Sequence, residues 1–468
     1  MTPITLDYAN MVAPNLTGAG IDPERLGMDL AERFREAYES VDSARASGEM
    51  GFFQLPYASE TLARTQELAD GYGQWFENVV ILGIGGSALG ARTLRDALLG
   101  PLWNEMDDVA RDHFPRIYVL DNVDPHTVHD LLGHIDIRRS LFNVVSKSGS
   151  TAETMALYLV LEGLLIDEVG PEKARGHFLF TTDPSEGPLR AIAEAEGIPS
   201  LPIPPNVGGR FSVLSPVGLL PAAVAGIDVA GLLAGAARVD DRCRTPVLRE
   251  NPAGLMATLL HTAHSESQAS IHVMMPYSNR LRSFSAWFQQ IWAESLGKAH
   301  DLTGRPVHTG PTPLPALGVT DQHSQLQLFM EGPRDKVVMF VAVTGDGADQ
   351  ESEDLEIAAH RSGMQSVGYL AGHGLGELLN IERQATAEAL RREGRPSMTF
   401  EIDTLDAESL GELFMLVSIA TVYAGALYGV NPLDQPGVEL SKELTYGLMG
   451  RSGHDVPVLP AADPRWRV

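Results

Sequence analysis

The chain has 468 residues, of which 44% are hydrophobic, and a formal charge of −26 at pH 7. A chain of this length can bury substantial cores and is typical of two or three domains. The acidic excess argues against general nucleic-acid binding, because neutralising phosphates requires clustered lysine and arginine. The single cysteine, Cys243, excludes an intramolecular disulfide framework. Because the first residues also lack the charged and apolar regions of a signal peptide, we expect a cytoplasmic protein.

Short apolar runs that predict strands alternate with helical patterns along most of the chain. This alternation is typical of a doubly wound parallel sheet with helices on both faces. It restarts in the second half, so we expect two α/β domains between N- and C-terminal helical arms, with boundaries at 1–50, 51–240, 241–430 and 431–468. The expected strands are residues 79–82, 117–120, 141–145, 178–180, 271–275, 337–343, 367–370 and 398–402.

A glycine-rich turn, Gly-Ile-Gly-Gly-Ser at 83–87, follows the first expected strand and precedes a helix. With Ala88 in the place of the third glycine or alanine, it meets the loose form of the dinucleotide-binding fingerprint. That fingerprint also requires an acidic residue at the end of a following strand. Asp107 and Asp108 are poorly placed for this role, because they are expected in a loop. Paired with the loop after a neighbouring strand, the turn indicates two turns converging on one ligand, with Ser87 as a donor to a phosphate or sugar hydroxyl.

The most informative stretch is Ser-Lys-Ser-Gly-Ser-Thr at 146–151, which joins an expected strand to an expected helix. The N–H groups that begin a helix lack internal partners and carry the positive end of its dipole, so they attract phosphate. The hydroxyls add donors, and Gly149 lets the backbone approach an anion closely. An ordinary helix N-cap is the alternative. Four hydroxyls and a lysine exceed what a cap needs, and we therefore predict a bound phosphate.

Further segments carry candidate catalytic or binding side chains. Each of their charged side chains, taken alone, is most simply a solvated surface group. They are Arg210 after two glycines, Gln290 and Glu294 as i,i+4 neighbours on one helix face, His323 after Gln322, and Lys442 one turn into a helix that follows Asp434 and Gln435.

Residues 413–430 contain no charged side chain and reach the lower length limit of a membrane span. The run contains serine, threonine, tyrosine and glycine, and no basic flank marks an orientation in a membrane. We interpret it as a helix buried in the protein core and expect no membrane partner.

The order of the motifs matches one family. The segments at 83–87, 146–151, 208–212, 290–294, 322–323 and 434–442 closely resemble, in this order, those of the glucose-6-phosphate isomerase (phosphoglucose isomerase) family. The resemblance runs from about residue 75 to 445, and its most specific parts are Gly-Gly-Arg-Phe-Ser at 208–212 and Gln-Pro-Gly-Val-Glu-Leu-Ser-Lys at 435–442. Gly149 stands where many members carry a bulkier residue, which is similar to the shorter bacterial branch.

The resemblance implies two sugar-isomerase (SIS-type) domains. It also implies the reversible isomerisation of glucose 6-phosphate and fructose 6-phosphate through a cis-enediol intermediate, in glycolysis and gluconeogenesis. It gives Glu294 the role of base, Arg210 that of enediolate stabiliser, and His323 and Lys442 that of the ring-opening pair. The implied substrate-binding residues are Gly86, Ser87, Ser146, Lys147, Ser148, Gly149, Ser150, Thr151, Gln290 and Gln435.

The resemblance also bears on partners and cofactors. Members usually act as homodimers with shared active sites, so His323 is expected to serve the site of the partner subunit. No cofactor is implied, and no group of His, Cys and Asp has the spacing of a metal site.

Two other classes stay open on the sequence. A non-catalytic sugar-phosphate regulator built from the same domains would keep the phosphate loop and lose the base, whereas Glu294 is present. A glutamine-dependent aminosugar synthase needs a nucleophilic cysteine near its N-terminus, whereas the only thiol here is that of Cys243. A dual glucose/mannose phosphate isomerase is a variant of the leading class.

Overall fold

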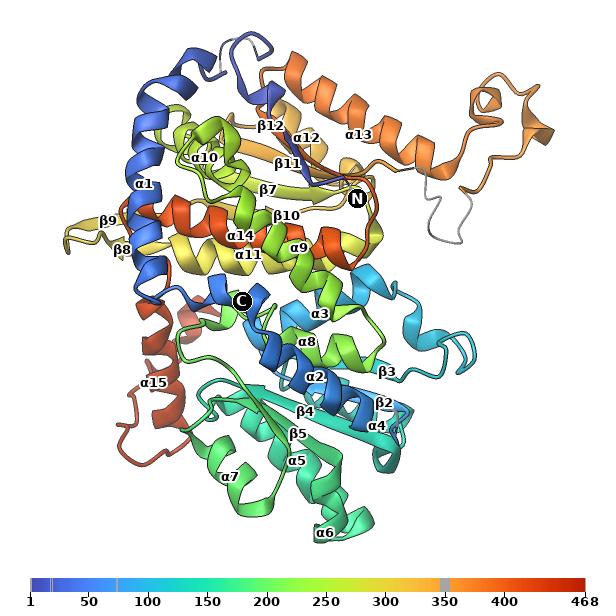
Figure 1. Cartoon of the computed structure of the whole chain (residues 1–468), viewed down its shortest axis with the longest axis vertical. Coiled ribbons are helices and arrows are strands. Elements are labelled where there is room, and N and C mark those ends of the chain that lie inside the picture. Colours follow the sequence, from blue (N-terminus) through green and yellow to red (C-terminus); the bar gives the residue numbers. More distant parts are fainter. Residues whose placement is uncertain (1, 17, 19, 73–74, 346–353, 468) are drawn as a thin grey trace.

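A computed structural model shows two five-stranded β-sheets, one above the other along the long axis of the molecule (Figure 1). It describes residues 2–16, 18, 20–72, 75–345 and 354–467. The two α/β halves expected from the sequence are both present, each with helices on its two faces.

The first sheet is parallel throughout, with the strand order β3-β2-β4-β5-β6. Every residue of β2, β4 and β5 is buried, which explains why their sequences are mostly apolar. The chain passes from β2 outward to β3 and then back across β2 to β4, so the strand order reverses between β2 and β4. Ligands of open α/β sheets bind at the carboxyl ends of strands at such a reversal. The strands are β2 (Asn78–Leu82), β3 (Arg116–Leu120), β4 (Ser140–Ser146), β5 (Phe178–Thr182) and β6 (Ser200–Pro202).

Successive side chains of β2 point to opposite faces of this sheet, as strand geometry requires. Val79 and Ile81 belong to the cluster under α2, α3 and α8, whereas Val80 and Leu82 belong to the cluster under α4, α5 and α7. These helices are α2 (Ser59–Tyr72), α3 (Gly86–Leu98), α4 (Pro125–His134), α5 (Ala152–Val169), α7 (Pro188–Glu196) and α8 (Pro216–Val224), and the short α6 (Pro171–Ala174) follows α5.

The second sheet has the strand order β1-β12-β11-β7-β10, in which β1 alone runs antiparallel to its neighbour. Because β1 pairs with β12, the N-terminal arm joins the second half of the molecule. The domain boundaries at 50, 240 and 430 stay a prediction. The strands are β1 (Thr5–Asp7), β7 (Ile271–Pro276), β10 (Thr312–Pro315), β11 (Lys336–Val343) and β12 (Ser397–Ile402).

Helices α10, α11 and α14 cover one face of the second sheet, and α12 and α13 cover the other. Helices α1 and α9 pack on α14. The bounds are α1 (Asp29–Ala46), α9 (Val229–Arg242), α10 (Pro252–Ser267), α11 (Arg282–Leu296), α12 (Leu326–Glu331), α13 (Leu375–Arg392) and α14 (Ala407–Tyr428).

The uncharged run at 413–430 falls on α14, and its interpretation as a buried helix is confirmed. Within the described part of the chain, α14 is the one helix long and apolar enough to cross a membrane, and 89% of its most apolar window is buried. It contacts α1, α9, α10 and α11. The absence of charge therefore reflects burial among helices.

The strand expected at 367–370 is wrong, because Gly368–Leu370 forms a 3-10 helix, η13. The N–H of Gly368 donates to Met364 O across a turn at 2.7 Å, and Tyr369 is 71% exposed. This apolar run lies in the segment that connects β11 to α13. A run of four residues carries too little periodicity to separate a strand from a turn.

Two further elements project from the body of the molecule. They are the hairpin of β8 (Lys298–His300) and β9 (Pro306–Thr309), and helix α15 (Glu439–Leu448) with the tail that follows it (Figure 1).

Candidate active site

The glycine-rich turn at 83–87 lies against two other motifs that the sequence singled out. A Cβ atom on Gly86 would stand 2.2 Å from Gly209 O, and one on Gly85 would stand 2.9 Å from Gln290 Nε2. Gly85 also has a φ of +57°, which glycine adopts without strain. Only glycines allow this approach, and they bring three motifs together at the carboxyl end of β2. Ser87, the second residue of α3, is partly buried at the same turn.

The hydroxyl loop at 146–151 follows β4, the neighbour of β2 across the reversal of strand order. Ser146 Oγ lies 2.9 Å from Thr151 Oγ1, and Ser148 Oγ accepts from the backbone N–H of Ser150 at 3.2 Å. Gly149 has a φ of +64°. Thr151 is the N-cap residue of α5, yet its side chain makes no capping hydrogen bond. The Thr151 hydroxyl is paired with Ser146 instead, and the interpretation of the loop as an anion site stays a prediction.

Lys147 points away from the hydroxyls. Its Nζ donates to Pro205 O at 2.6 Å and to Val207 O at 3.0 Å, and burial lowers the pKa of its ammonium group. These carbonyls belong to the segment that leads into Gly208 and Arg210. Lys147 thus ties the hydroxyl loop to the segment that carries Arg210. A direct contact between Lys147 and a phosphate stays a prediction.

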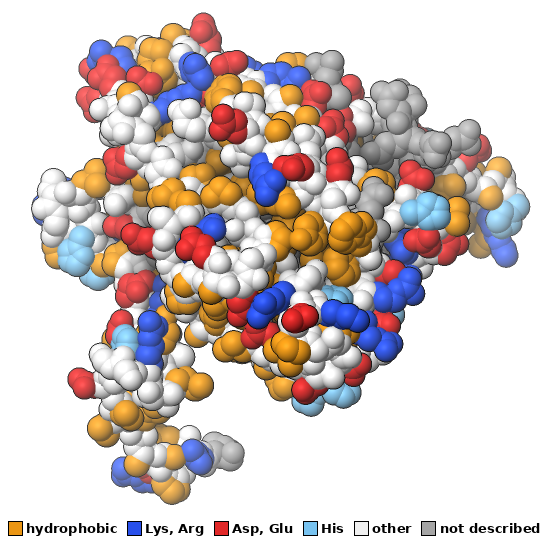
Figure 2. Space-filling model, turned by 60° about the horizontal axis from the view of Figure 1, so that its bottom comes forward, with side chains coloured by type: hydrophobic (Ala, Val, Ile, Leu, Met, Phe, Trp, Pro, Cys, Tyr) orange, Lys and Arg blue, Asp and Glu red, His pale blue; other side chains and the backbone are white. Residues whose placement is uncertain are grey.

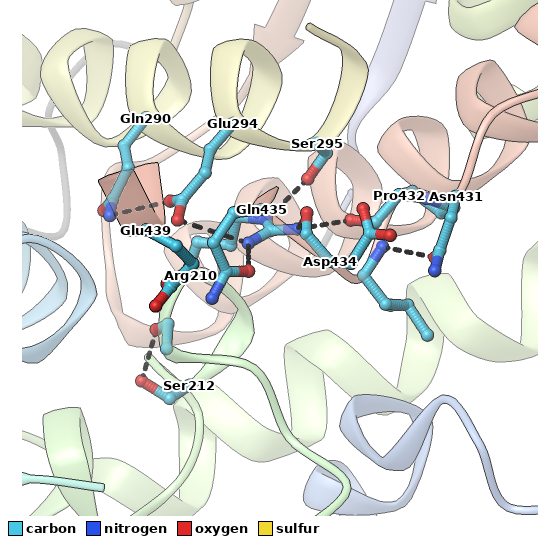
Figure 3. A network of polar contacts seen from close by, with 12 residues as sticks. Arg210, Ser212, Gln290, Glu294, Ser295, Asn431, Pro432, Asp434, Gln435 and Glu439 are labelled. Atoms are coloured by element: carbon cyan, nitrogen blue, oxygen red, sulfur yellow. Dashed lines mark hydrogen bonds and ion pairs between the residues drawn. The ribbon is translucent and has the colours of Figure 1, made fainter. Parts of the chain in front are cut away.

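The Arg210 side chain is buried and fully engaged by the protein (Figure 3). Arg210 lies on η8 (Gly209–Phe211), and its side chain is 2% exposed. Its Nε donates to Ser295 Oγ at 2.7 Å and its Nη1 to Gln435 Oε1 at 2.8 Å, while Nη2 donates to Pro432 O at 2.6 Å and to Asp434 O at 3.0 Å. Burial lowers the pKa of Arg210 from its very high ordinary value. An arginine nevertheless keeps its charge, so the site holds a fixed cation.

Glu294 occupies the last turn of α11 and faces this cation. Its Oε1 lies 3.4 Å from Arg210 Nη1, and its Oε2 accepts from Gln290 Nε2 at 3.2 Å (Figure 3). Gln290 Oε1 is buried without a hydrogen-bond partner among the described residues. A buried acceptor without a partner is unusual in a native structure, and it gives a substrate hydroxyl a place to donate.

The two residues expected to open the sugar ring lie apart from this cluster. Lys442, on α15, donates to Glu439 Oε1 at 2.7 Å, and its side chain is 48% exposed. His323 ends η11 (Thr320–His323) of the second half and is exposed. Among the contacts that the structure gives for the described residues, none joins either side chain to Glu294, and their roles stay predictions.

Sequence reasoning missed the residues that support the cluster. Ser295 accepts a hydrogen bond from Arg210, and Lys298 donates to Glu294 O at 2.7 Å. Lys298 lies two residues beyond the end of α11, at the start of β8, so no helix periodicity in the sequence pointed to it. Within the described ranges, no group of three or more His, Cys, Asp or Glu could hold a metal ion. The cluster offers a carboxylate, a guanidinium, amides and hydroxyls, which suit proton transfer and anion binding.

The chain is similar to proteins of one family over most of its length. The family model described as phosphoglucose isomerase matches residues 60–455. The chain belongs to the phosphoglucose isomerase family. It is 44% identical over 457 residues to the glucose-6-phosphate isomerase of Rubrobacter xylanophilus, across 97% of this chain and 100% of that protein. The protein of the same name from Carboxydothermus hydrogenoformans is 40% identical over 457 residues, across 97% of this chain and 96% of its own.

Solved structures share the phosphoglucose isomerase fold found here. A hypothetical protein from Thermus thermophilus superposes with a TM-score of 0.84 at 38% identity, covering 96% of this chain and 100% of its own. A glucose-6-phosphate isomerase from Chlamydia trachomatis gives a TM-score of 0.81 at 22% identity, covering 96% of this chain and 88% of its own. The fold class expected from the sequence is therefore confirmed.

Proposed function

We propose that this chain is a glucose-6-phosphate isomerase that interconverts glucose 6-phosphate and fructose 6-phosphate, in glycolysis and gluconeogenesis, without a cofactor. The observation that carries the proposal is the Glu294 carboxylate held between Arg210 at 3.4 Å and Gln290 at 3.2 Å, at the strand-order reversal of the first sheet. The names of the relatives in the same family support the reaction, and none of those named above is a regulator.

Aldose–ketose isomerisation of the open sugar moves one proton between two adjacent carbons through an enediolate. Glu294 is suited to take the proton from one carbon and return it to the other, because its side chain is 25% exposed beside a buried cation. General acid–base catalysis of this kind contributes about 10²–10⁴-fold to the rate.

Arg210 provides the fixed charge that an enediolate requires. Its guanidinium donates hydrogen bonds to Ser295, Gln435, Pro432 and Asp434, and it forms an ion pair with Glu294 at 3.4 Å. Two of the acceptors are backbone carbonyls, whereas the side chains of Gln435 and Glu294 can turn toward a substrate. Preorganised charge of this kind is worth about 3 kcal/mol to the transition state.

The sugar phosphate would lie across the ends of β2 and β4. The hydroxyls of Ser148 and Thr151 and the first N–H groups of α5 suit the phosphate, while Ser87 and Gln290 suit the sugar hydroxyls. Such a placement brings the reacting carbons toward Glu294, because Gly85 and Gly86 pack against α11 and η8.

We further propose a cytoplasmic homodimer in which His323 of one chain completes the site of the other, with Lys442 beside it in ring opening. The C-terminal arm projects from the body with hydrophobic side chains along it (Figure 2). Leu440 is 69% exposed, Met449 81%, Val458 99% and Trp466 82%. Apolar side chains so exposed on a projecting arm favour burial against a second chain.

A coupled assay that follows fructose 6-phosphate formation from glucose 6-phosphate tests the function, and the same assay with mannose 6-phosphate tests the dual-specificity variant. Turnover with glucose 6-phosphate is the expected result. If the wild-type chain binds the sugar phosphate without turning it over, the regulator class replaces the isomerase.

A further inference from the structure

Lys298 lies just beyond the end of α11, four residues after Glu294, and its side chain is 6% exposed. Its Nζ donates to Glu294 O at 2.7 Å and to Asp434 O at 2.8 Å, and it lies 3.5 Å from Asp434 Oδ1. Asp434 O also accepts from Arg210 Nη2 at 3.0 Å. Two buried cations therefore share one backbone carbonyl.

The Lys298 ammonium group therefore links the backbone of Glu294, the proposed base, to the backbone segment around Asp434 that binds Arg210. The last carbonyls of a helix lack intrahelical donors, and a lysine there satisfies one of them. Through Asp434, the same ammonium group holds the segment that supplies Gln435 and the carbonyls that receive Arg210. Two buried cations so close are unfavourable in themselves; burial and then the Arg210 charge lower the pKa of Lys298.

We propose that Lys298 is a positioning residue for the isomerisation, which fixes Glu294 relative to Arg210 through the carbonyl oxygens of Glu294 and Asp434. The inference rests on the proposed function. A displacement of about 1 Å at a catalytic group can lower the rate about 10²-fold. Phosphate binding should be unaffected, because the loop at 146–151 is held by other contacts.

Lys336 provides a matched control. It is also a buried lysine at the first position of a strand, with a side chain 7% exposed against 6% for Lys298. Its Nζ is paired with Asp335, next to it in the chain. Lys336 begins β11, and none of the contacts given for the described residues joins its side chain to Arg210 or Glu294.

The test compares the full-length variants Lys298→Met and Lys336→Met by kcat, KM and Tm, with the inhibition constant of inorganic phosphate as a probe of the phosphate loop. We expect Lys298→Met to lower kcat at least 30-fold, with KM and the phosphate constant within threefold of wild type. Lys336→Met should match it in Tm loss while keeping kcat within threefold. If Lys298→Met loses kcat but keeps its KM, and its Tm equals that of Lys336→Met, the loss cannot come from general destabilisation.

A kcat of Lys298→Met within threefold of wild type would overturn the proposal, and so would an equal loss of kcat in Lys336→Met. If Lys298→Met does not fold, Lys298→Gln takes its place, because a shorter neutral amide cannot span both carbonyls. A folded Gln variant should lose at least tenfold in kcat, and wild-type kcat in it contradicts the proposal. If the wild type is active and the variant is unaffected, only the positioning role of Lys298 is rejected. If the wild type is inactive, the proposed function is rejected as well.

Discussion

Glu294 and Arg210 form an ion pair at 3.4 Å in which the two partners differ sharply in exposure, 25% for the glutamate side chain and 2% for the arginine. The cation is thus part of the protein interior, whereas the carboxylate side chain is partly exposed to solvent. We expect a substrate to reach the carboxylate more readily than the guanidinium. This difference suits a group that exchanges protons beside a group that stabilises charge.

Glu294→Gln should abolish isomerisation with little effect on substrate binding. The amide keeps the shape and a hydrogen bond to its neighbours but cannot accept a proton from carbon. Loss of a base affects the transition state and not the ground state, so kcat should fall by about 10²-fold or more while KM barely moves. Steady-state kinetics on the purified variant measures both. If a tenth of the rate remains, another residue transfers the proton.

The hydroxyl loop should respond in the opposite way. Replacing Ser148 and Thr151 by alanine removes donors that would be used in the ground and transition states alike, so KM should rise more than kcat falls. Crystals soaked with sulfate or a sugar phosphate should show the anion against residues 146–151. An anion at 83–87 alone would reverse the assignment of the two turns.

The strands of the first sheet and the turns after them could be predicted because their signals are local. Buried parallel strands such as β2 have mostly apolar sequences, and glycines or hydroxyls follow the strands at the edge of the sheet where ligands bind. The joining of Gly86 to Gly209 could not be predicted by spacing, since it depends on how η8 packs on α3. Family resemblance supplied that grouping.

Side-chain direction and long-range pairing were not predictable. Lys147 belongs to the phosphate motif but donates to carbonyls at 205 and 207, and Lys298 acts on backbone oxygens that leave no trace in sequence. The pairing of β1 with β12 joins residues near opposite ends of the chain. In each case a tertiary contact overrides what the local pattern indicates.

Two histidines, His272 and His261, are kept neutral by burial. His272, on β7, is fully buried, and its Nδ1 accepts from Trp292 Nε1 of α11 at 3.0 Å. Burial lowers the pKa of His272 to about 3 and that of His261 to about 4. The folded state therefore resists protonation of groups that titrate near 6.5 when the chain is unfolded.

Stability should consequently be lost on acidification below about pH 6.5. The folded pKa of His272 is depressed, so its contribution is complete above the unfolded pKa and declines as the pH falls toward about 3. At pH 5 the loss from one such histidine is about 2 kcal/mol relative to pH 8.

His272→Asn should reduce this pH dependence, because its Oδ1 can still accept from Trp292 but does not titrate. Thermal unfolding of wild type and variant at pH 8 and pH 5 measures the difference. His129→Asn is the control, since the His129 side chain is 88% exposed. Equal pH dependence in wild type and His272→Asn would show that acid lability arises elsewhere.

The proposed dimer makes the most demanding prediction. If His323 completes the partner's site, chains with His323→Ala and chains with Glu294→Gln should each be nearly inactive as homodimers. In a mixed dimer, one site carries both lesions and the other carries neither, so activity should recover to about half the wild-type value per dimer. If His323 acts within its own chain, every site keeps one lesion and no activity returns. Heterodimers purified through two different tags and assayed before subunits exchange decide between these outcomes. No recovery in a verified heterodimer would eliminate the shared site while leaving the isomerase function standing, because Glu294 and Arg210 come from one chain in either arrangement.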